Sequence, residues 1–213
     1  MYLKRAFQAI IFSQCLITSS SFATTGGGQN IELLGFDKKE KKLFLLRHFE
    51  DGRGRLPQLY YYKFDNTSKA PPLIEVKSLY INPKTHKIDY DQDSKRFDQE
   101  MDKIINRLTP LIKVENGQPQ LHILRQRTQE VPSWHEENET LTEYNFTYQV
   151  ESNGLSSIPQ QATAYLPELN IAQQYRIPTQ NKMIVTIEYF GVPIETGYNL
   201  EDPVLLTPIK QMR

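Results

Sequence analysis

Strict alternation of apolar and polar side chains over residues 143–150 is the feature that most constrains the fold. Tyr144, Phe146, Tyr148 and Val150 are each flanked by polar residues. A period of two places successive side chains on opposite faces of a strand, so one face of this segment is apolar and the other is polar. The segment therefore predicts a long strand in a sheet that is buried on one side.

Several other segments predict neighbouring strands. Residues 31–36, 43–49 and 60–64 are short apolar runs separated by turn-forming residues, which is typical of an antiparallel meander. Residues 183–190 predict a further strand that has Met183, Val185, Ile187 and Tyr189 on one face. We therefore expect a sheet of many strands in which most neighbours are antiparallel.

Two segments carry turn-forming or chain-breaking residues. Asn116-Gly117 predicts a hairpin between residues 111–114 and 121–127, because this dipeptide suits a tight type I′ turn. The tail from Gly191 to Arg213 contains three prolines, which favours irregular structure with one edge strand.

One segment has the period of a helix. Asp93 or Ser94 can cap its first turn, and Pro110 ends it. Its apolar side chains recur at intervals that place them on one helical face: Phe97, Met101, Ile104, Ile105 and Leu108. The expected fold class is α+β, a mostly antiparallel β-sheet of about eight to ten strands with one principal helix near residues 94–108.

The N-terminus has the pattern of a signal peptide. Lys4 and Arg5 precede a largely apolar run over residues 6–17, and small residues at Ser21 and Ala23 suit a cleavage site after Ala23. The run is about 12 residues long, whereas a membrane-spanning helix needs about 20. We predict a signal peptide over residues 1–23 and no transmembrane segment after its cleavage. An uncleaved anchor is the alternative.

The remaining chain is predicted to form one domain. Residues 24–30 are glycine-rich and polar, which predicts a flexible leader. Residues 31–213 contain no long linker and have the length of a single β-rich domain, although a split near Gln129 is an alternative. The only cysteine, Cys15, leaves with the signal peptide, which excludes disulfides, thiolate metal sites and a cysteine nucleophile in the mature protein. The predicted location is periplasmic or secreted.

The charge is balanced in total and uneven along the chain. The whole sequence holds 25 Lys and Arg against 25 Asp and Glu. Residues 24–128 hold 19 basic against 14 acidic residues, whereas residues 129–203 hold 2 against 11. A neutral total argues against nucleic-acid binding, which depends on a basic field. The asymmetry favours either a partner surface or two parts of one fold that neutralise each other.

Residues 89–100 match the spacing of a calcium-binding loop. The positions that would ligate the ion are occupied by Asp89, Asp91, Asp93 and Glu100. Ser94 stands where glycine normally allows the sharp turn, and Pro83 opposes an entering helix. The calcium interpretation therefore competes with an acidic helix N-terminus that is favoured by the helix dipole. Calcium is the one cofactor that the sequence suggests.

Two further features are candidates for a contact surface. Residues 129–140 predict an acidic loop with the only tryptophan at its centre: Trp134, His135, Glu136 and Glu137. Tyr60 and Tyr62 lie on one face of a tyrosine-rich strand, and tyrosine is enriched in protein interfaces. A histidine beside carboxylates also suits a general base.

These features together favour binding over catalysis. The sequence has no Gly-x-Ser-x-Gly elbow or similar motif for nucleophilic chemistry. We predict an exported, periplasmic, non-enzymatic protein that binds a protein or an envelope component, and an inhibitor or immunity-type protein is the specific form. A small envelope hydrolase that uses His135 and neighbouring carboxylates is one alternative, and a calcium-stabilised binding domain is another.

Overall fold

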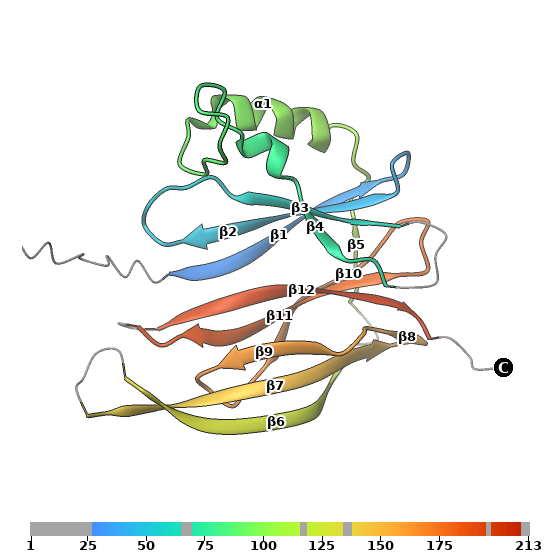
Figure 1. Ribbon diagram of the computed structural model, residues 1–213. Helices are drawn as coiled ribbons and strands as arrows, with labels where there is room; N and C mark the ends of the chain where they lie inside the picture. Colours follow the sequence, from blue (N-terminus) through green and yellow to red (C-terminus); the bar gives the residue numbers. More distant parts are fainter. Residues whose placement is uncertain (1–26, 65–69, 116–118, 134–137, 195–196, 210–213) are drawn as a thin grey trace, which may run out of the picture.

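The computed structural model describes residues 27–64, 70–115, 119–133, 138–194 and 197–209 (Figure 1). The predicted signal peptide, residues 1–23, lies outside the described residues. The first strand, β1 (Gly28–Asp37), begins within the predicted leader, so residues 28–30 belong to the sheet instead of a flexible segment. The mostly β character of the fold is confirmed.

The N-terminal strands form the meander that the apolar runs predict, and we call them the upper sheet (Figure 1). β1 pairs antiparallel with β2 (Lys42–Glu50), and β2 pairs antiparallel with β3 (Gln58–Lys63). β3 pairs antiparallel with the short β4 (Leu73–Glu75). The contacts among β1, β2 and β3 are local in sequence, and for this reason the pattern of apolar runs was sufficient to predict them.

A 3-10 turn and the predicted helix cover the outer face of the upper sheet (Figure 1). They are η1 (Lys77–Tyr80) and α1 (Ser94–Ile105), and Asp93 caps α1 by accepting the N–H of Lys95 at 2.9 Å. The buried side chains between helix and sheet are Phe44, Leu46, Leu56, Leu59, Tyr80, Phe97 and Met101. Neither of these helices, the two in the described ranges, has the length and apolar content that crossing a bilayer requires.

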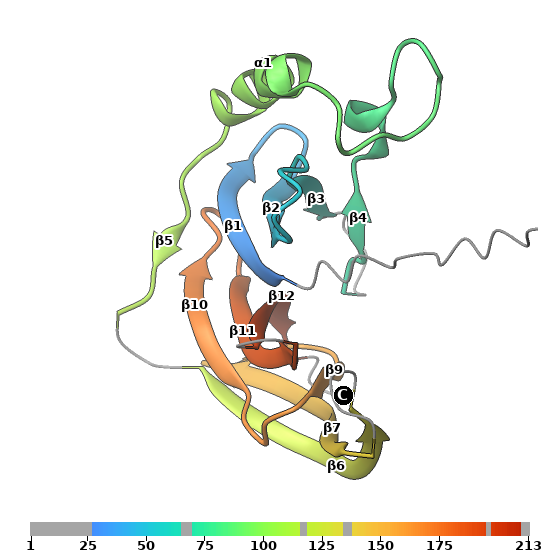
Figure 2. The ribbon, with the colours of Figure 1, turned by 90° about the vertical axis from the view of Figure 1, so that its left-hand side faces the viewer.

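The C-terminal strands continue the same sheet. β12 (Tyr198–Pro208) pairs in parallel with β1 and antiparallel with β11 (Met183–Val192). β11 pairs with β10 (Asn170–Arg176), and β10 pairs with β5 (Ile112–Lys113). The strand order is β4-β3-β2-β1-β12-β11-β10-β5, and Figure 2 shows how strongly this sheet curls.

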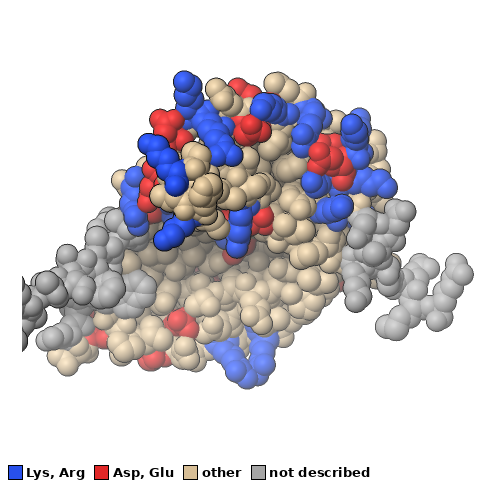
Figure 3. Space-filling view, turned by 45° about the horizontal axis from the view of Figure 1, so that its top comes forward, with Lys and Arg blue, Asp and Glu red and all other residues tan. Residues whose placement is uncertain are grey.

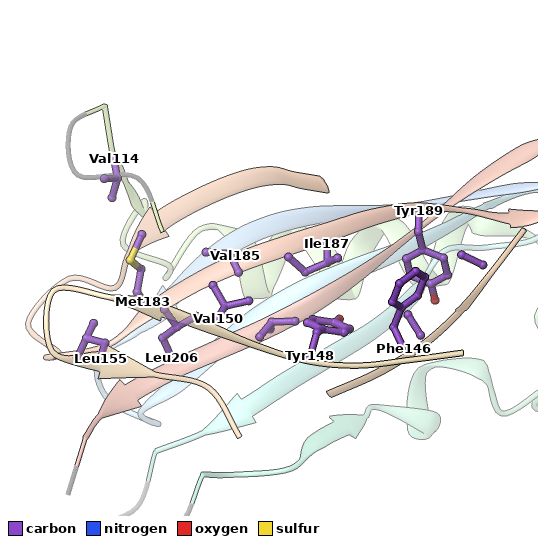
Figure 4. Packing of buried hydrophobic residues seen from close by; sticks show 13 residues of the cluster. Val114, Phe146, Tyr148, Val150, Leu155, Met183, Val185, Ile187, Tyr189 and Leu206 are labelled. Atoms are coloured by element: carbon purple, nitrogen blue, oxygen red, sulfur yellow. The ribbon is translucent and has the colours of Figure 1, made fainter. Parts of the chain in front are cut away.

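Four further strands form a second layer, which we call the lower sheet (Figure 1). They are β6 (Gln120–Pro132), β7 (Thr140–Ser152), β8 (Leu155–Ser156) and β9 (Gln160–Ala164). β7 pairs with β6, β8 and β9, and β8 also pairs with β12. The core between this layer and β11 and β12 (Figure 4) contains Val114, Phe146, Tyr148, Val150, Leu155, Ala162, Ala164, Met183, Val185, Ile187, Tyr189, Val204 and Leu206.

The sheet has 12 strands and is mixed, so the prediction of about eight to ten strands in a mostly antiparallel sheet needs correction. The parallel pair joins β1 and β12, which come from opposite ends of the chain. The sequence of neither strand indicates a pairing partner that far away. The predicted hairpin around Asn116-Gly117 is wrong as well. Residues 116–118 lie outside the described residues, and Ile112–Lys113 pairs with β10 instead of with β6.

The C-terminal tail forms a central strand, which corrects the expectation of irregular structure. Pro203 lies opposite Thr186 of β11. β1 pairs with β12 only at Gln29 and Leu200, so no described strand forms ladder hydrogen bonds with the other side of β12 at Pro203. The N–H that proline lacks is therefore not needed for a second ladder at this position.

Side chains replace the ladder bonds that are lost where β1 diverges from β12. Glu201 is 7% exposed, and its Oε2 accepts the N–H of Ile31 at 2.7 Å. The Gln173 Nε2 amide donates to the Ile31 carbonyl oxygen at 2.7 Å and to Glu201 Oε1 at 2.8 Å. The Thr186 hydroxyl also donates to Glu201 Oε1. Both backbone groups of Ile31 are thus satisfied by side chains from the C-terminal strands.

Candidate functional site

β6 is a long strand at the free edge of the lower sheet (Figures 1 and 2). It has 13 residues and, among the described strands, it pairs only with β7. All of its side chains are exposed except those of Leu121 and Val131, which are half-buried. An edge of this length presents a row of backbone N–H and C=O groups that a further strand can pair with.

A bulge divides β6 into two parts with different surroundings. The register with β7 shifts between Ile123 and Arg125. Before the bulge, Leu121 packs against the lower core. Ile123 and Leu124, at the bulge, are 44% and 52% exposed. The strand therefore carries apolar surface at the bulge and polar residues beyond it, and nothing in the described chain covers either part.

The outer face of the lower sheet carries three aligned rows of polar side chains, which we call the arginine face. The register pairs Arg125 with Thr147, Arg127 with Asn145, and Gln129 with Glu143. β9 extends the first two rows, because Gln161 pairs with Thr147 and Thr163 pairs with Asn145. Most of these side chains line a shallow depression of about 570 Å³. The arginine face comprises Arg125, Arg127, Gln129, Glu143, Asn145, Thr147, Gln161 and Thr163.

Hydrogen bonds fix one part of the arginine face and leave the arginines available. The Glu143 carboxylate accepts Gln129 Nε2 at 2.6 Å and Asn145 Nδ2 at 2.7 Å. The Thr163 hydroxyl donates to Asn145 Oδ1 at 3.0 Å. Arg125 and Arg127 are exposed, and neither has a described carboxylate within ion-pair distance. Two guanidinium groups are thus free to bind an anion.

The ion pairs show how far the two oppositely charged segments contact each other directly. Figure 3 shows basic and acidic side chains interspersed over the part of the surface that carries the upper sheet and α1. There, Arg107 pairs with Asp37 at 2.7 Å. Among the described residues, Arg47 with Asp202, at 3.0 Å, is the only Lys or Arg pair that joins residues 24–128 to residues 129–203. Among the described residues, direct Lys or Arg pairing between the two segments is therefore limited to one contact.

The predicted contact residues lie away from the arginine face or outside the described chain. Trp134, His135, Glu136 and Glu137 lie outside the described residues, between the ends of β6 and β7. The acidic loop is shorter than predicted, because β6 continues to Pro132 and β7 begins at Thr140. Tyr62 is only 6% exposed, and its hydroxyl donates to the Pro203 carbonyl oxygen at 3.1 Å. Tyr60 is half-buried and donates to Gln58 Oε1 at 2.8 Å.

The four carboxylates of the predicted calcium loop each have a protein partner. Asp93 caps α1, and Glu100 pairs with Lys103 Nζ at 2.7 Å. Asp91 pairs with Arg53 at 3.3 Å, and Asp89 accepts Asn82 Nδ2 at 3.0 Å. No group of three His, Cys, Asp or Glu side chains among the described residues is arranged to hold a metal ion. Calcium binding stays a prediction, and the observed arrangement is that of a capped helix N-terminus.

The arginine face was not predicted, although the sequence contained a sign of it. Arg125, Arg127 and Gln129 alternate, which places them on one face of a strand. Residues 120–164 contain these two arginines and no other Lys or Arg. All the basic charge of this segment therefore lies on one face of one strand. No protein-family model matches this chain, and neither the curated proteins nor the solved structures contain a significant match.

Proposed function

We propose that this protein is an exported, non-enzymatic binding protein that holds an extended segment of a partner protein along β6. The observation that carries the proposal is the 13-residue edge strand, exposed along almost its whole length and bordered by the arginine face. Strand addition uses the free backbone groups for affinity and the alternating side chains for specificity.

The side chains of β6 favour a partner segment with a defined charge pattern. Arg125 and Arg127 lack carboxylate partners among the described residues, so acidic side chains opposite them would form charge-assisted hydrogen bonds. Glu130 lies further along the strand, where a basic side chain would be favoured. Ile123 and Leu124 supply exposed apolar area at the bulge. A periplasmic inhibitor or immunity-type protein is the specific form of this function.

Charge reversal tests the proposal. Affinity capture from an envelope extract of the source cells would use the wild-type mature chain, the variant R125E/R127E, and K84E/K87E as control. Lys84 and Lys87 are exposed, lie far from β6 in the upper half, and undergo the same change of charge. We expect the wild-type chain and the control to capture the same protein and R125E/R127E to lose it.

The outcome that contradicts the proposal is equally specific. Capture of the same protein by all three chains would exclude the arginine face as the contact surface. Binding should also weaken as salt is raised, because ion pairs at the rim of an interface are screened. The affinity of the wild-type chain across a salt series, compared with that of R125E/R127E, measures this contribution.

A further inference from the structure

A groove lies between the two sheets on the side of β12 that β1 leaves free. Its volume is about 320 Å³, which is at the lower end of the range for small-molecule sites. Its polar lining comprises Arg47, Tyr62, Tyr148, Gln160, Gln161 and Asp202. Its apolar walls include Pro71, Pro72, Ile158 and Leu205. We call it the junction groove, and we infer that it binds a neutral, hydroxyl-rich ligand of about the size of one sugar ring.

The charged groups in the junction groove neutralise each other. Arg47 Nη2 lies 3.0 Å from Asp202 Oδ1, and the Tyr189 hydroxyl donates to Asp202 Oδ2 at 2.6 Å. The Arg47 guanidinium also lies over the ring of Tyr60, at 5.5 Å from its centroid. A charged ligand would have to displace Arg47 or Asp202 from their ion pair in order to bind the other. The groove therefore favours a neutral ligand.

One donor in the junction groove, the Tyr148 hydroxyl, lacks a partner in the described chain. Tyr148 is 1% exposed, and its ring lies in the lower core (Figure 4), but its hydroxyl makes no hydrogen bond with any described residue. Burial and the nearby Asp202 and Tyr62 raise the pKa of Tyr148, so the hydroxyl remains protonated and can donate.

Unpartnered buried donors are uncommon because each costs about 1–3 kcal/mol relative to a satisfied group. The Tyr148 side chain lines a space large enough for a ligand. Ligand hydroxyl groups can accept from the Tyr148 hydroxyl and donate to Asp202 or to the side-chain oxygens of Gln160 and Gln161. A ligand hydroxyl both donates and accepts hydrogen bonds, so it suits a lining of donors and acceptors better than an anion or an apolar group does.

The test is an NMR titration of the isotope-labelled mature protein with neutral sugars. The probes are glucose, galactose, mannose and N-acetylglucosamine, with glucuronate as a charged comparison. We expect at least one neutral sugar to shift the resonances of residues that line the junction groove. Absence of such shifts for all four sugars, or stronger binding of glucuronate, would overturn the inference.

Tyr148→Phe is the matched variant. It removes a hydroxyl that has no partner in the described fold, so we expect its unfolding free energy to equal or exceed that of the wild type while sugar affinity falls by about tenfold. Unchanged affinity would contradict the inference. Ile158→Trp changes a wall residue that is 56% exposed and should also block the groove. R125E/R127E should bind sugar normally, which separates this inference from the proposed function.

Discussion

Glu201 is a single buried carboxylate on which the junction of the sheet depends. It accepts hydrogen bonds from Ile31, Gln173 and Thr186, which belong to three different strands. No Lys or Arg pairs with it among the described residues. Its role is therefore to accept backbone and side-chain donors where β1 and β12 separate, a position at which no strand can supply carbonyl groups.

Truncation of Glu201 should be strongly destabilising. Glu201→Ala leaves two buried donors, the Ile31 N–H and the Thr186 hydroxyl, without their acceptor, so we expect a loss of about 3 kcal/mol or more in the unfolding free energy. Glu151→Ala, an exposed glutamate on β7, is the control and should change it by less than about 0.5 kcal/mol. Urea unfolding curves measure both. Equal effects of the two substitutions would refute the role assigned to Glu201.

Asp37 is the second residue whose ionised state supports the fold. Burial alone would raise its pKa, but the N–H groups of Glu40 and Lys39 and the Arg107 guanidinium together hold the pKa below its ordinary value. A carboxyl with a lowered pKa contributes stability above its unfolded pKa, near about 4, and loses that contribution as the pH falls through its folded pKa.

Asp37→Asn should therefore have a pH-dependent effect. At pH 7 we expect the variant to be less stable than the wild type by about 2 kcal/mol, because charge-assisted hydrogen bonds are lost. Below pH about 4 the difference should shrink, since the wild-type carboxyl becomes protonated as well. Urea unfolding at a series of pH values measures the difference. A difference that stays constant down to acid pH would show that the ionised state of Asp37 is not what stabilises the turn.

The residue scale also shows what the sequence can predict. Asp93 is recognisable as a helix cap because a cap acts on the residues that immediately follow it. Glu201 stands beside Asp202 in an acidic, proline-containing tail and has no local sign of burial. Its partners lie on strands that are distant in sequence, so only the assembled sheet reveals its role.

At the scale of elements, local periodicity predicted α1, β7 and β11. β11 also buries Ile184 and Thr186 on the face opposite its predicted apolar side, because it lies between two packed layers. The pairing partners of β5 and β12 were not predicted from the sequence. They are set by the curl of the sheet rather than by the residue pattern of either strand. A proline inside β12 made a central strand look like an edge.

The packing of α1 gives a test at the element scale. Met101 is 5% exposed beneath the helix, whereas Ile105 is 47% exposed, although both belong to the predicted apolar face. Met101→Ala should lower the unfolding free energy by about 2–5 kcal/mol, and Ile105→Ala by less than about 1 kcal/mol. Thermal or urea unfolding checks the contrast. Similar losses would show that α1 packs on the upper sheet in a different rotation.

At the scale of the whole molecule, two packed layers share a central set of strands. β11 and β12 contribute side chains to the lower core on one face and to a core with the upper sheet on the other. β6 lies beyond this shared structure and contacts little except β7. The protein thus combines a buried centre with one long strand that, among the described strands, pairs on one side only.

The sequence predicted the compartment and the general class of function, which both remain proposals, but it placed the contact residues elsewhere. Tyr62 is held in the core, and residues 134–137 lie outside the described chain. A free edge cannot be recognised from sequence, because a strand with an unpaired side has the same alternation as a paired one. The arginine face became visible only when three strands were aligned in register.

Amide hydrogen exchange of the partner complex tests the central claim most directly. Residues of β6 should exchange at least about tenfold more slowly in the complex than in the free protein, because added strand pairing protects amides at the edge. The amides of α1, on the far side of the upper sheet, should exchange equally in both. Protection of other elements with β6 unchanged would contradict the account.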